Sequence, residues 1–306
     1  MSEESLAKWL LTGMGGVLGW GIRQALPART FAFAGRHRPD FWPDAPGVRL
    51  DLAVPGEFRG VLEMLQPEVV VHAACISRAQ ECADFPELTR QVNVAAVQEW
   101  LATSTSQESF PLYISTEQVF DGRADSYAES SPVCPLSLYG ETKAEAEALV
   151  LAEGGAVVRL PLLLGPEVGV GRCGADTAIV KAVGAGQRLR LFHDEYRTPV
   201  AAAALGPMLW QIASRRLPGV FHLSGSESVS RLELGEAACE LAGLKPNFDA
   251  VSAADFAGPP RSLKLNLENT RSQEVLGWEP PNLRQSLAWT ATPPAVEVTP
   301  VQTEES

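Results

Sequence analysis

A glycine-rich turn near the start of the chain restricts its fold more than any other feature. The short apolar run Trp9–Leu11 leads into a turn in which Gly13, Gly16 and Gly19 recur at three-residue spacing, and apolar residues at helical spacing follow. A strand, a glycine turn and a helix in this order are the context that a dinucleotide-binding fingerprint requires. Glycines let the backbone approach a pyrophosphate, and the helix N-terminus offers unpaired N–H groups to its charge. We therefore predict a dinucleotide site here, with an ordinary glycine turn as the alternative. The residues expected to contact the cofactor are Gly13, Gly16, Val17, Leu18 and Gly19.

A basic turn follows the second apolar run. The run Thr30–Ala34 is followed by Gly35, Arg36, His37 and Arg38. In NAD-preferring proteins of this type an acidic residue near this point binds the ribose hydroxyls, whereas an arginine accommodates a 2′-phosphate. We interpret Arg36, with Arg38 as the alternative, as a preference for NADP(H) over NAD(H). A solvated basic turn explains each arginine equally well when it is taken singly.

Three further segments are expected to support the cofactor. Asp51 and Leu52 follow a third apolar run and are placed to meet the adenine ring. Ala73 and Ala74 end the fourth run with small side chains, so the cofactor can lie against the strand tip. Asn93 falls on a helix predicted over residues 86–103, where its side chain is able to hold a local backbone distortion near the site.

A tyrosine, a lysine and a threonine form the predicted catalytic set. Tyr139 and Lys143 are spaced i, i+4 and share one face of a helix. A free phenol has a pKa of about 10 and is a poor base at neutral pH, and a nearby ammonium lowers that pKa by favouring the phenolate. Thr116 follows the apolar run Leu112–Ile114 and can donate a hydrogen bond to the same substrate oxygen. An isolated Tyr-x-x-x-Lys match is more often a surface tyrosine and a solvated lysine, but the upstream pattern favours proton transfer to or from a carbonyl.

Alternating strand and helix patterns predict an α/β fold with a Rossmann-type doubly wound parallel sheet. Thr116 then lies at the carboxyl edge of the sheet, where open α/β folds bind ligands. The last residues are rich in Pro, Thr, Val and Glu without periodicity, which is typical of disorder. The expected parts are a cofactor-binding domain over residues 1–158 with a strand returning from about 217–240, a smaller C-terminal substrate-binding lobe over 159–216 and 241–289, and a disordered tail over 290–306.

Composition excludes several classes of function. A net charge of −12 disfavours nucleic acid and anionic membrane surfaces as partners. The five cysteines include no C-x-x-C pair and the four histidines do not cluster with them, so we expect neither a disulfide framework nor a metal site. No run approaches the roughly 20 apolar residues needed to span a bilayer, and the acidic start is unlike a signal peptide. We therefore expect a cytoplasmic protein.

Several motifs together resemble the extended short-chain dehydrogenases/reductases, the NAD-dependent epimerase/dehydratase superfamily, and within it the dTDP-4-dehydrorhamnose reductase-like group. The motifs extend from about residue 8 to residue 289, and they are Gly13-x-x-Gly16-x-x-Gly19, Asp51-Leu52, His72-Ala73-Ala74, Val92-Asn93-Val94, Ile114-Ser115-Thr116, Val119-Phe120-Asp121-Gly122, Pro135-Leu136-Ser137-x-Tyr139-Gly140-x-Thr142-Lys143, Arg159-Leu160-Pro161 and Gly219-Val220-Phe221-His222-Leu223-Ser224-Gly225. The resemblance implies hydride transfer from NADPH to a nucleotide-linked 4-keto-6-deoxysugar, as in dTDP-rhamnose biosynthesis. It makes Tyr139 the proton donor, Lys143 the residue that tunes it and holds the ribose, and Thr116 the hydroxyl that polarises the carbonyl. Pro161 would turn the chain over the nicotinamide, and a homodimer is the common assembly of this scaffold.

The substrate contacts are less constrained than the cofactor contacts. The reductase group usually has Asp-Tyr after the serine–threonine pair, whereas this chain has Glu117 and Gln118. Sugar-nucleotide dehydratases have a second acid there, and because Gln118 cannot transfer its proton, dehydratase activity is not expected. In an acidic chain, local arginines must bind an anionic nucleotide sugar; surface salt bridging is the alternative role for them. The candidate substrate residues are Arg78, Glu117, Arg197 and Arg261.

Two other functions fit the same scaffold. A sugar-nucleotide epimerase would retain bound NAD, which the basic turn at Arg36 and Arg38 disfavours. A non-catalytic nucleotide-binding regulatory subunit, like the beta subunit of methionine adenosyltransferase, is the second. The intact set of Thr116, Tyr139 and Lys143 weakens this alternative without removing it.

Overall fold

A seven-stranded sheet forms the centre of the molecule. The computed structural model describes residues 9–25, 31–39, 41–42, 46–169, 171–255 and 261–291. The strands of the sheet are in the order β11-β6-β5-β4-β1-β2-β3, and every pairing between them is parallel. The predicted α/β class and Rossmann-type doubly wound sheet are therefore confirmed. The strands are β1 (Trp9–Thr12), β2 (Phe31–Gly35), β3 (Gly47–Arg49), β4 (Val69–His72), β5 (Phe110–Thr116), β6 (Ala156–Leu160) and β11 (Gly219–His222).

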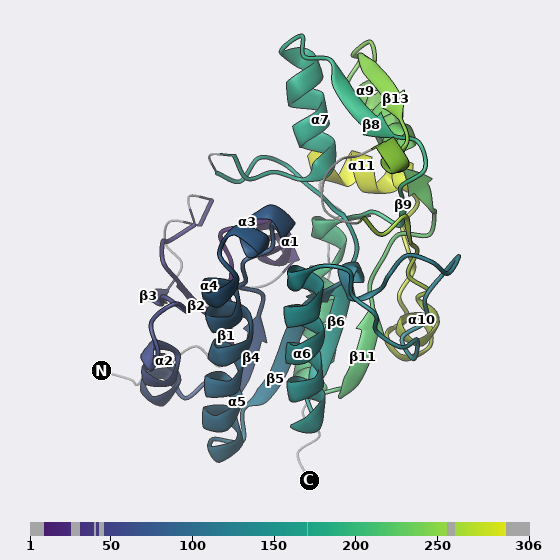
Figure 1. Ribbon diagram of the computed structural model, residues 1–306. Helices are drawn as coiled ribbons and strands as arrows, with labels where there is room; N and C mark the ends of the chain where they lie inside the picture. The colour runs from purple at the N-terminus through teal and green to yellow at the C-terminus, as the bar shows by residue number, and fades with distance from the viewer. Residues whose placement is uncertain are drawn as a thin grey trace.

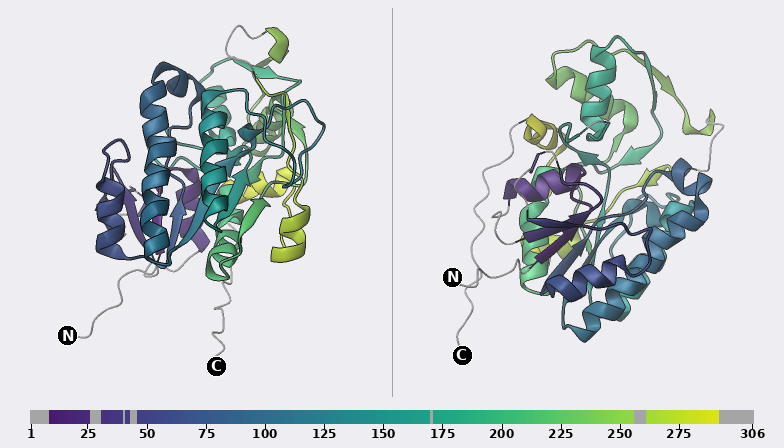
Figure 2. Two further views of the ribbon diagram at one scale, coloured as in Figure 1. Left: turned by 60° about the horizontal axis from the view of Figure 1, so that its bottom comes forward. Right: turned by 90° about the vertical axis from the view of Figure 1, so that its left-hand side faces the viewer.

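Helices cover both faces of this sheet, because successive strand residues point to opposite sides. In β5, Leu112 and Ile114 belong to one buried apolar cluster, while Tyr113 belongs to the other. The first cluster packs under α1 (Val17–Ala25), α8 (Gly206–Ser214) and α10 (Thr270–Leu276). The second packs under α2 (Glu57–Leu65), α5 (Ala96–Ser106) and α6 (Leu138–Ala152), which stand in a row in Figures 1 and 2.

The helix predicted over residues 86–103 is present and contains a local distortion. It is built from α4 (Pro86–Arg90), a π-helical turn η2 (Gln91–Ala95) and α5, which continue one another. Asn93 is buried inside the π-helical turn. Such turns are often found at functional sites, and Asn93 lies where the sequence placed it, on a distorted stretch of helix.

A smaller lobe stands above the carboxyl edge of the sheet (Figure 1). Its core is an apolar cluster to which Ile179, Leu191 and Leu234 contribute. The elements around this cluster are α7 (Ala175–Gly184), β8 (Leu189–Phe192), α9 (Arg231–Leu241), β13 (Phe248–Val251) and α11 (Leu283–Ala291). The lobe is joined to the sheet by short strands, namely β7 (Leu163–Leu164) paired with β10 (Val200–Ala201), and β9 (Tyr196–Arg197) between β12 (Val229–Ser230) and β14 (Lys264–Leu265).

In the second half of the chain, the structure assigns two helices to other parts of the molecule than the sequence analysis expected. The helix α8, with the short turn η4 (Ala202–Ala204), packs against α1 and so belongs with the sheet. The helix α9 was expected with the returning strand, yet it packs against α7 and β8 in the small lobe. The reason is that β11 ends at the carboxyl edge, so the chain leaves it directly into the lobe. Helix α10 then returns to pack on β11.

Two expectations concern the ends of the chain and its relation to membranes. Of the predicted tail 290–306, only Thr290 and Ala291 lie within the described residues, where they form the last turn of α11, and Thr290 Oγ1 donates to Asp176 Oδ2 at 2.8 Å. Among the described helices, none has the length and apolar character required for a membrane span.

Candidate active site

The glycine turn between β1 and α1 packs closely against the end of β4. Gly13 has φ +75°, and a Cβ there would lie 2.5 Å from the Ala74 nitrogen and 2.6 Å from the Ala73 carbonyl carbon. The Thr12 hydroxyl accepts hydrogen bonds from the backbone N–H groups of both alanines at 3.2 Å. A side chain at Gly13 is thus excluded by backbone atoms. The turn and the small residues at the tip of β4 form one surface.

The two other glycines of the fingerprint have different surroundings. A Cβ at Gly19 would lie 2.1 Å from the Met14 carbonyl oxygen, so Gly19 is required for α1 to pack against its own preceding turn. Within the part of the chain that the structure describes, a Cβ at Gly16 would meet only the Gly13 oxygen, at 3.9 Å. Val17 begins α1 beside this open space. A dinucleotide pyrophosphate fits this arrangement, because the helix N-terminus and an unobstructed backbone face the same side.

A pocket of about 390 Å³ lies beside the glycine turn. Arg38 lines it, whereas Arg36 is exposed and is not among the described residues of its wall. Asp51 and Leu52 follow β3 at the same edge; the Asp51 carboxylate accepts from the Ala53 N–H at 3.1 Å and Leu52 is buried. The described residues that line the pocket are Gly15, His37, Arg38, Pro39, Val168, Gly169 and Arg172.

Tyr139 and Thr116 converge at the carboxyl edge of β5 because the start of α6 packs on the turn η3 (Glu117–Val119). Ser137 caps α6 by accepting from the Gly140 N–H at 3.2 Å. A Cβ at Gly140 would lie 2.3 Å from the Gln118 oxygen, so the helix start and the turn are in close contact. The Thr116 hydroxyl is within hydrogen-bonding reach of the Tyr139 phenol, and both residues are 7 % exposed.

Lys143 lies one turn further along α6, but its ammonium points into the sheet. Its Nζ donates to the Ile114 carbonyl oxygen at 2.6 Å and lies 3.9 Å from the centroid of the Tyr113 ring. The side chain is fully buried, and this burial lowers the pKa of the Lys143 ammonium. Tyr139 and Lys143 do share one helix face, as their spacing predicts.

The expected lowering of the Tyr139 pKa was wrong. Burial raises the pKa of the phenol well above its ordinary value of 10, and the nearby Cys75 adds to the effect, while the Thr116 hydroxyl acts in the opposite direction. The physical reason is that burial of a phenolate away from water costs more free energy than the hydrogen bond from Thr116 contributes. Tyr139 therefore carries its proton at neutral pH, which is the state that a proton donor needs.

Asn93 connects the loop after β4 to α6. Its Oδ1 accepts from the Ile76 N–H at 2.9 Å, and its Nδ2 donates to the Ile76 oxygen at 3.0 Å and to the Thr142 hydroxyl at 3.1 Å. Thr142 directly precedes Lys143. The π-helical turn thus fixes the loop that begins with Cys75 against the helix that carries Tyr139.

The predicted substrate arginine Arg197 is used internally by the protein. It is 8 % exposed, and its Nε contacts Glu117 Oε1 at 2.9 Å while its Nη2 contacts Glu195 Oε1 at 3.3 Å. Its Nη1 and Nη2 also donate to three backbone oxygens. The expectation that Arg197 binds a substrate pyrophosphate is therefore corrected, since each of its guanidinium nitrogens already has a protein partner.

Glu117 is buried against this arginine and does not face solvent. Burial raises the pKa of its carboxyl from 4.5 to about 7; Arg197 opposes this shift and Glu195 reinforces it. Desolvation outweighs the ion pair, as is common for buried charge pairs. Glu117 therefore holds Arg197 in place, and the predicted direct contact with substrate is not what this geometry provides.

Two further arginines belong to the same cluster. Arg261 is 37 % exposed, contacts Glu195 Oε2 through its Nε at 2.6 Å, and lies over the Phe192 ring. Arg231 begins α9, and its buried Nη1 has no hydrogen-bond partner among the described residues. Burial, together with Arg197 and Arg261, lowers the pKa of Arg231. Among the described residues, this cluster contains the three guanidinium groups of Arg197, Arg231 and Arg261 and the two carboxylates of Glu117 and Glu195.

Sequence reasoning missed Arg231, although a signal was present. A cation in the first turn of a helix interacts unfavourably with the helix dipole. An arginine directly after the capping serine Ser230 therefore suggests that its charge is used for another purpose, such as binding an anion. Arg78, in contrast, is exposed at the start of α3 (Ala79–Asp84), away from this cluster's ion pairs. Pro161 is buried after β6, close to the start of the small lobe.

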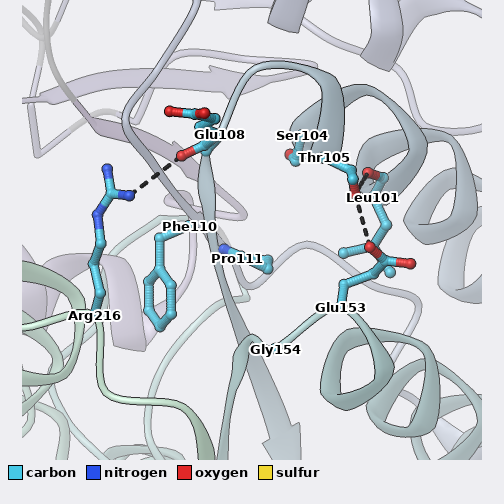
Figure 3. Close-up of a pocket in the computed structure, with 10 residues that line it drawn as sticks. Leu101, Ser104, Thr105, Glu108, Phe110, Pro111, Glu153, Gly154 and Arg216 are labelled. Atoms are coloured by element: carbon cyan, nitrogen blue, oxygen red, sulfur yellow. Dashed lines mark hydrogen bonds between the residues drawn. The ribbon is translucent and has the colours of Figure 1, made fainter.

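A second pocket, of about 260 Å³, is lined by other residues and is drawn in Figure 3. It lies at the start of β5, at the edge of the sheet opposite to Thr116, with Phe110 and Arg216 in its wall. Parallel α/β sheets bind ligands at their carboxyl edge, so this hollow is not the catalytic site. Nor do the described residues contain a group of three or more His, Cys, Asp or Glu side chains able to hold a metal ion.

Comparisons with known proteins agree with this geometry. Residues 7–293 match the family model of the RmlD substrate binding domain. The chain is 30% identical to methionine adenosyltransferase 2 subunit beta of Danio rerio over 285 residues, which is 88% of this chain and 84% of that protein. It is 26% identical to the probable low-salt glycan biosynthesis reductase Agl14 of Haloferax volcanii, over 91% of this chain and 95% of that protein.

A similar solved structure is the dTDP-4-dehydrorhamnose reductase of Bacillus anthracis, which was determined in complex with NADP. It superposes with a TM-score of 0.80 at 20% identity, covering 92% of this chain and 98% of that one. The fold is therefore shared over nearly the whole length of both proteins. On these grounds the chain belongs to the RmlD substrate binding domain family.

Proposed function

We propose that this protein is an NADPH-dependent reductase of a nucleotide-linked 4-keto-6-deoxysugar. The observation that carries the proposal is the convergence of a protonated Tyr139 and the Thr116 hydroxyl beside the glycine-lined edge of the sheet. Reduction of a carbonyl requires a proton donor at the oxygen, and both side chains can supply hydrogen bonds there. The family match from residue 7 to residue 293 supports this reading.

Each catalytic side chain has a distinct task in this reaction. When bound, the reduced nicotinamide supplies a hydride to the carbonyl carbon. Tyr139 transfers its phenolic proton to the developing alkoxide, while the Thr116 hydroxyl donates a hydrogen bond to the same oxygen. The Lys143 ammonium, one helical turn away, then favours the phenolate that remains on Tyr139. Buried as they are, these groups act where water does not compete.

The cofactor is proposed to be NADP(H) rather than NAD(H). Arg38 and His37 line the pocket beside the glycine turn, at the point where a Rossmann domain meets the 2′ position of the adenosine ribose. A net charge of −12 repels anions in general, so a local basic wall is needed to hold a phosphate. Gly16 and the start of α1 would bind the pyrophosphate.

The nucleotide sugar is proposed to bind under the small lobe, near the arginine cluster. Arg231 and Arg261 are the candidate partners of its pyrophosphate, because a buried nitrogen of Arg231 has no hydrogen-bond partner among the described residues and Arg261 is partly exposed. Arg197 would act indirectly, by holding β9 and Glu117 beneath them. An excess of guanidinium over carboxylate groups gives the site the charge that a diphosphate requires.

Turnover with a defined substrate tests the proposal. Purified protein is given NADPH and dTDP-4-keto-6-deoxyhexose, and oxidation of NADPH is followed by absorbance while the sugar product is identified by chromatography. Stoichiometric oxidation with formation of the reduced sugar supports the reductase. Interconversion of sugar epimers without net oxidation would instead identify an epimerase.

A second function is favoured by one comparison. The 30% identity to methionine adenosyltransferase 2 subunit beta of Danio rerio suggests a nucleotide-binding subunit that modulates another enzyme. In that case the protein would bind NADPH yet fail to reduce keto sugars. Size-exclusion chromatography with the methionine adenosyltransferase of the same organism, with and without NADPH, distinguishes the two. A stable complex together with catalytic inertness would replace the reductase proposal.

A further inference from the structure

A loop of the small lobe reaches across to the glycine turn. Residues 165–169 and 171–174 lie between β7 and α7 and belong to the teal loop that extends to the left below α7 in Figure 1. Its foot is closed by the Gly174 N–H donating to the Gly165 oxygen at 3.0 Å, and the Gly165 N–H donates to Asp176 Oδ1 at 3.0 Å. Near its tip, the Val168 N–H donates to the Arg172 oxygen at 2.9 Å. The loop is thus anchored at the foot and presents Arg172 at its far end.

Arg172 lies directly over the glycine turn. Its Nη1 donates to the Gly15 carbonyl oxygen at 3.2 Å. A Cβ at Gly15 would lie 2.7 Å from this nitrogen and touch no other residue as closely. Gly15 is not one of the three spaced glycines of the fingerprint. Because it has no side chain, the Arg172 guanidinium can lie against its backbone.

The pocket that Arg172 closes is basic. It is lined by His37 and Arg38 after β2, by Gly15 of the glycine turn, and by Val168, Gly169 and Arg172 of the loop. Its described lining residues include no carboxylate, although the chain as a whole has 37 acidic residues against 25 basic ones. Its volume of about 390 Å³ is within the range of small-ligand sites. A cavity with three basic side chains and no described acid suits a phosphate group.

We propose that Arg172 binds the 2′-phosphate of NADP(H), opposite to Arg38, and so places a residue of the small lobe on the cofactor. This inference rests on the proposed use of NADP(H). The position follows from the fold: the turn after β2 and the glycine turn together flank the adenosine ribose. An arginine binds a phosphate through two parallel N–H donors, and the contact to Gly15 holds the guanidinium at this point before the cofactor arrives. Because the loop belongs to the lobe, binding of the phosphate also fixes the lobe's loop against the sheet domain.

Binding of the two dinucleotides to Arg172→Gln tests the proposal. Dissociation constants for NADPH and NADH are measured by isothermal titration calorimetry, without any sugar. Loss of a hydrogen-bonded charge pair should weaken NADPH binding by about 10- to 100-fold, while NADH binding changes by less than about threefold because NADH has no 2′-phosphate. Adenosine 2′,5′-bisphosphate should lose affinity to the same degree as NADPH, and AMP should not.

Two further variants keep the test decisive. Arg190→Gln removes the same charge from an exposed position on β8 and should leave both dinucleotides unaffected. Arg172→Lys should bind NADPH with intermediate affinity, since lysine keeps the charge but not the paired donors. Equal losses for NADPH and NADH, or no loss for either, would overturn the role of Arg172. Failure of the unaltered protein to bind either dinucleotide would instead refute the proposed cofactor use, so the two failures are distinguishable.

Discussion

Glu117 Oε1 lies 2.9 Å from Arg197 Nε, and this buried ion pair joins the end of β5 to β9. The pair connects the sheet that carries Thr116 with the strands that support the small lobe. Glu195 contacts the same arginine through its Oε1 and contacts Arg261 through its Oε2. The ionic cluster therefore ties the catalytic edge to the proposed substrate region.

The pKa of Glu117 makes stability depend on pH in a defined window. Burial raises the pKa of this carboxyl from 4.5 to about 7 in the folded protein. Between these two values the folded chain retains a proton that the unfolded chain has lost, so the free energy of unfolding falls as pH rises through the window and is level above it. Glu117→Gln, which cannot ionise, should show a smaller decline between pH 5 and pH 8. Urea unfolding at several pH values measures this, with the exposed Glu87→Gln as the control. An unchanged slope in Glu117→Gln would contradict the assignment.

Removal of the phenolic hydroxyl should separate chemistry from binding. Tyr139→Phe keeps the buried ring but removes the proton donor, so kcat should fall by about 10²- to 10⁴-fold. NADPH affinity should change by less than about twofold, because the glycine turn and the basic pocket are untouched. Single-turnover kinetics and calorimetry give the two quantities. Full activity in Tyr139→Phe would refute the catalytic role of this residue.

The first half of the fold was predictable because its signals are local. The glycine spacing of residues 13–19, the apolar alternation of the strands and the Ser137 cap each act within a few residues. Asn93 was also placed correctly on a distorted helix, since the motif around it lies within one continuous helical pattern. These features fix the sheet and bring Tyr139 beside Thr116.

The roles of the arginines were not predictable, because they depend on contacts between distant segments. Arg197 lies on a two-residue strand held between two others of the same length, and such strands have no periodic pattern to read. Its pairing with Glu117 appears only when the lobe is folded against the sheet. The pKa of Tyr139 was misjudged for a related reason. Lysine spacing shows that an ammonium is near, but not that it donates to the Ile114 carbonyl, nor how deeply the phenol is buried.

Asn93 should contribute mainly by fixing the loop after β4. Asn93→Ala removes three hydrogen bonds and leaves the Ile76 backbone groups without this partner. Each buried polar group that loses its partner costs about 1–3 kcal/mol, so the free energy of unfolding should fall by about 2–4 kcal/mol in all. Urea unfolding measures the loss. Asn93→Asp retains the acceptor to the Ile76 N–H but buries a carboxylate oxygen against the Ile76 oxygen, so it should be at least as destabilising as Asn93→Ala. A loss below about 0.5 kcal/mol in Asn93→Ala would show that the loop is held by other contacts.

The glycines of the fingerprint should separate into two classes. Gly19→Ala places a Cβ 2.1 Å from the Met14 backbone oxygen, and neither atom can move without displacing α1 from its turn. This variant should lose stability, with a lower melting temperature in the absence of any ligand. Gly16→Ala, in contrast, meets no atom of the described residues closer than 3.9 Å, so its melting temperature should match that of the unaltered protein. Its Cβ projects into the space proposed for the pyrophosphate, and affinities for NADPH and NADH should therefore fall together. Thermal unfolding and calorimetry on the two variants test both statements. If Gly16→Ala bound both dinucleotides normally, the pyrophosphate would have to lie elsewhere than along the start of α1.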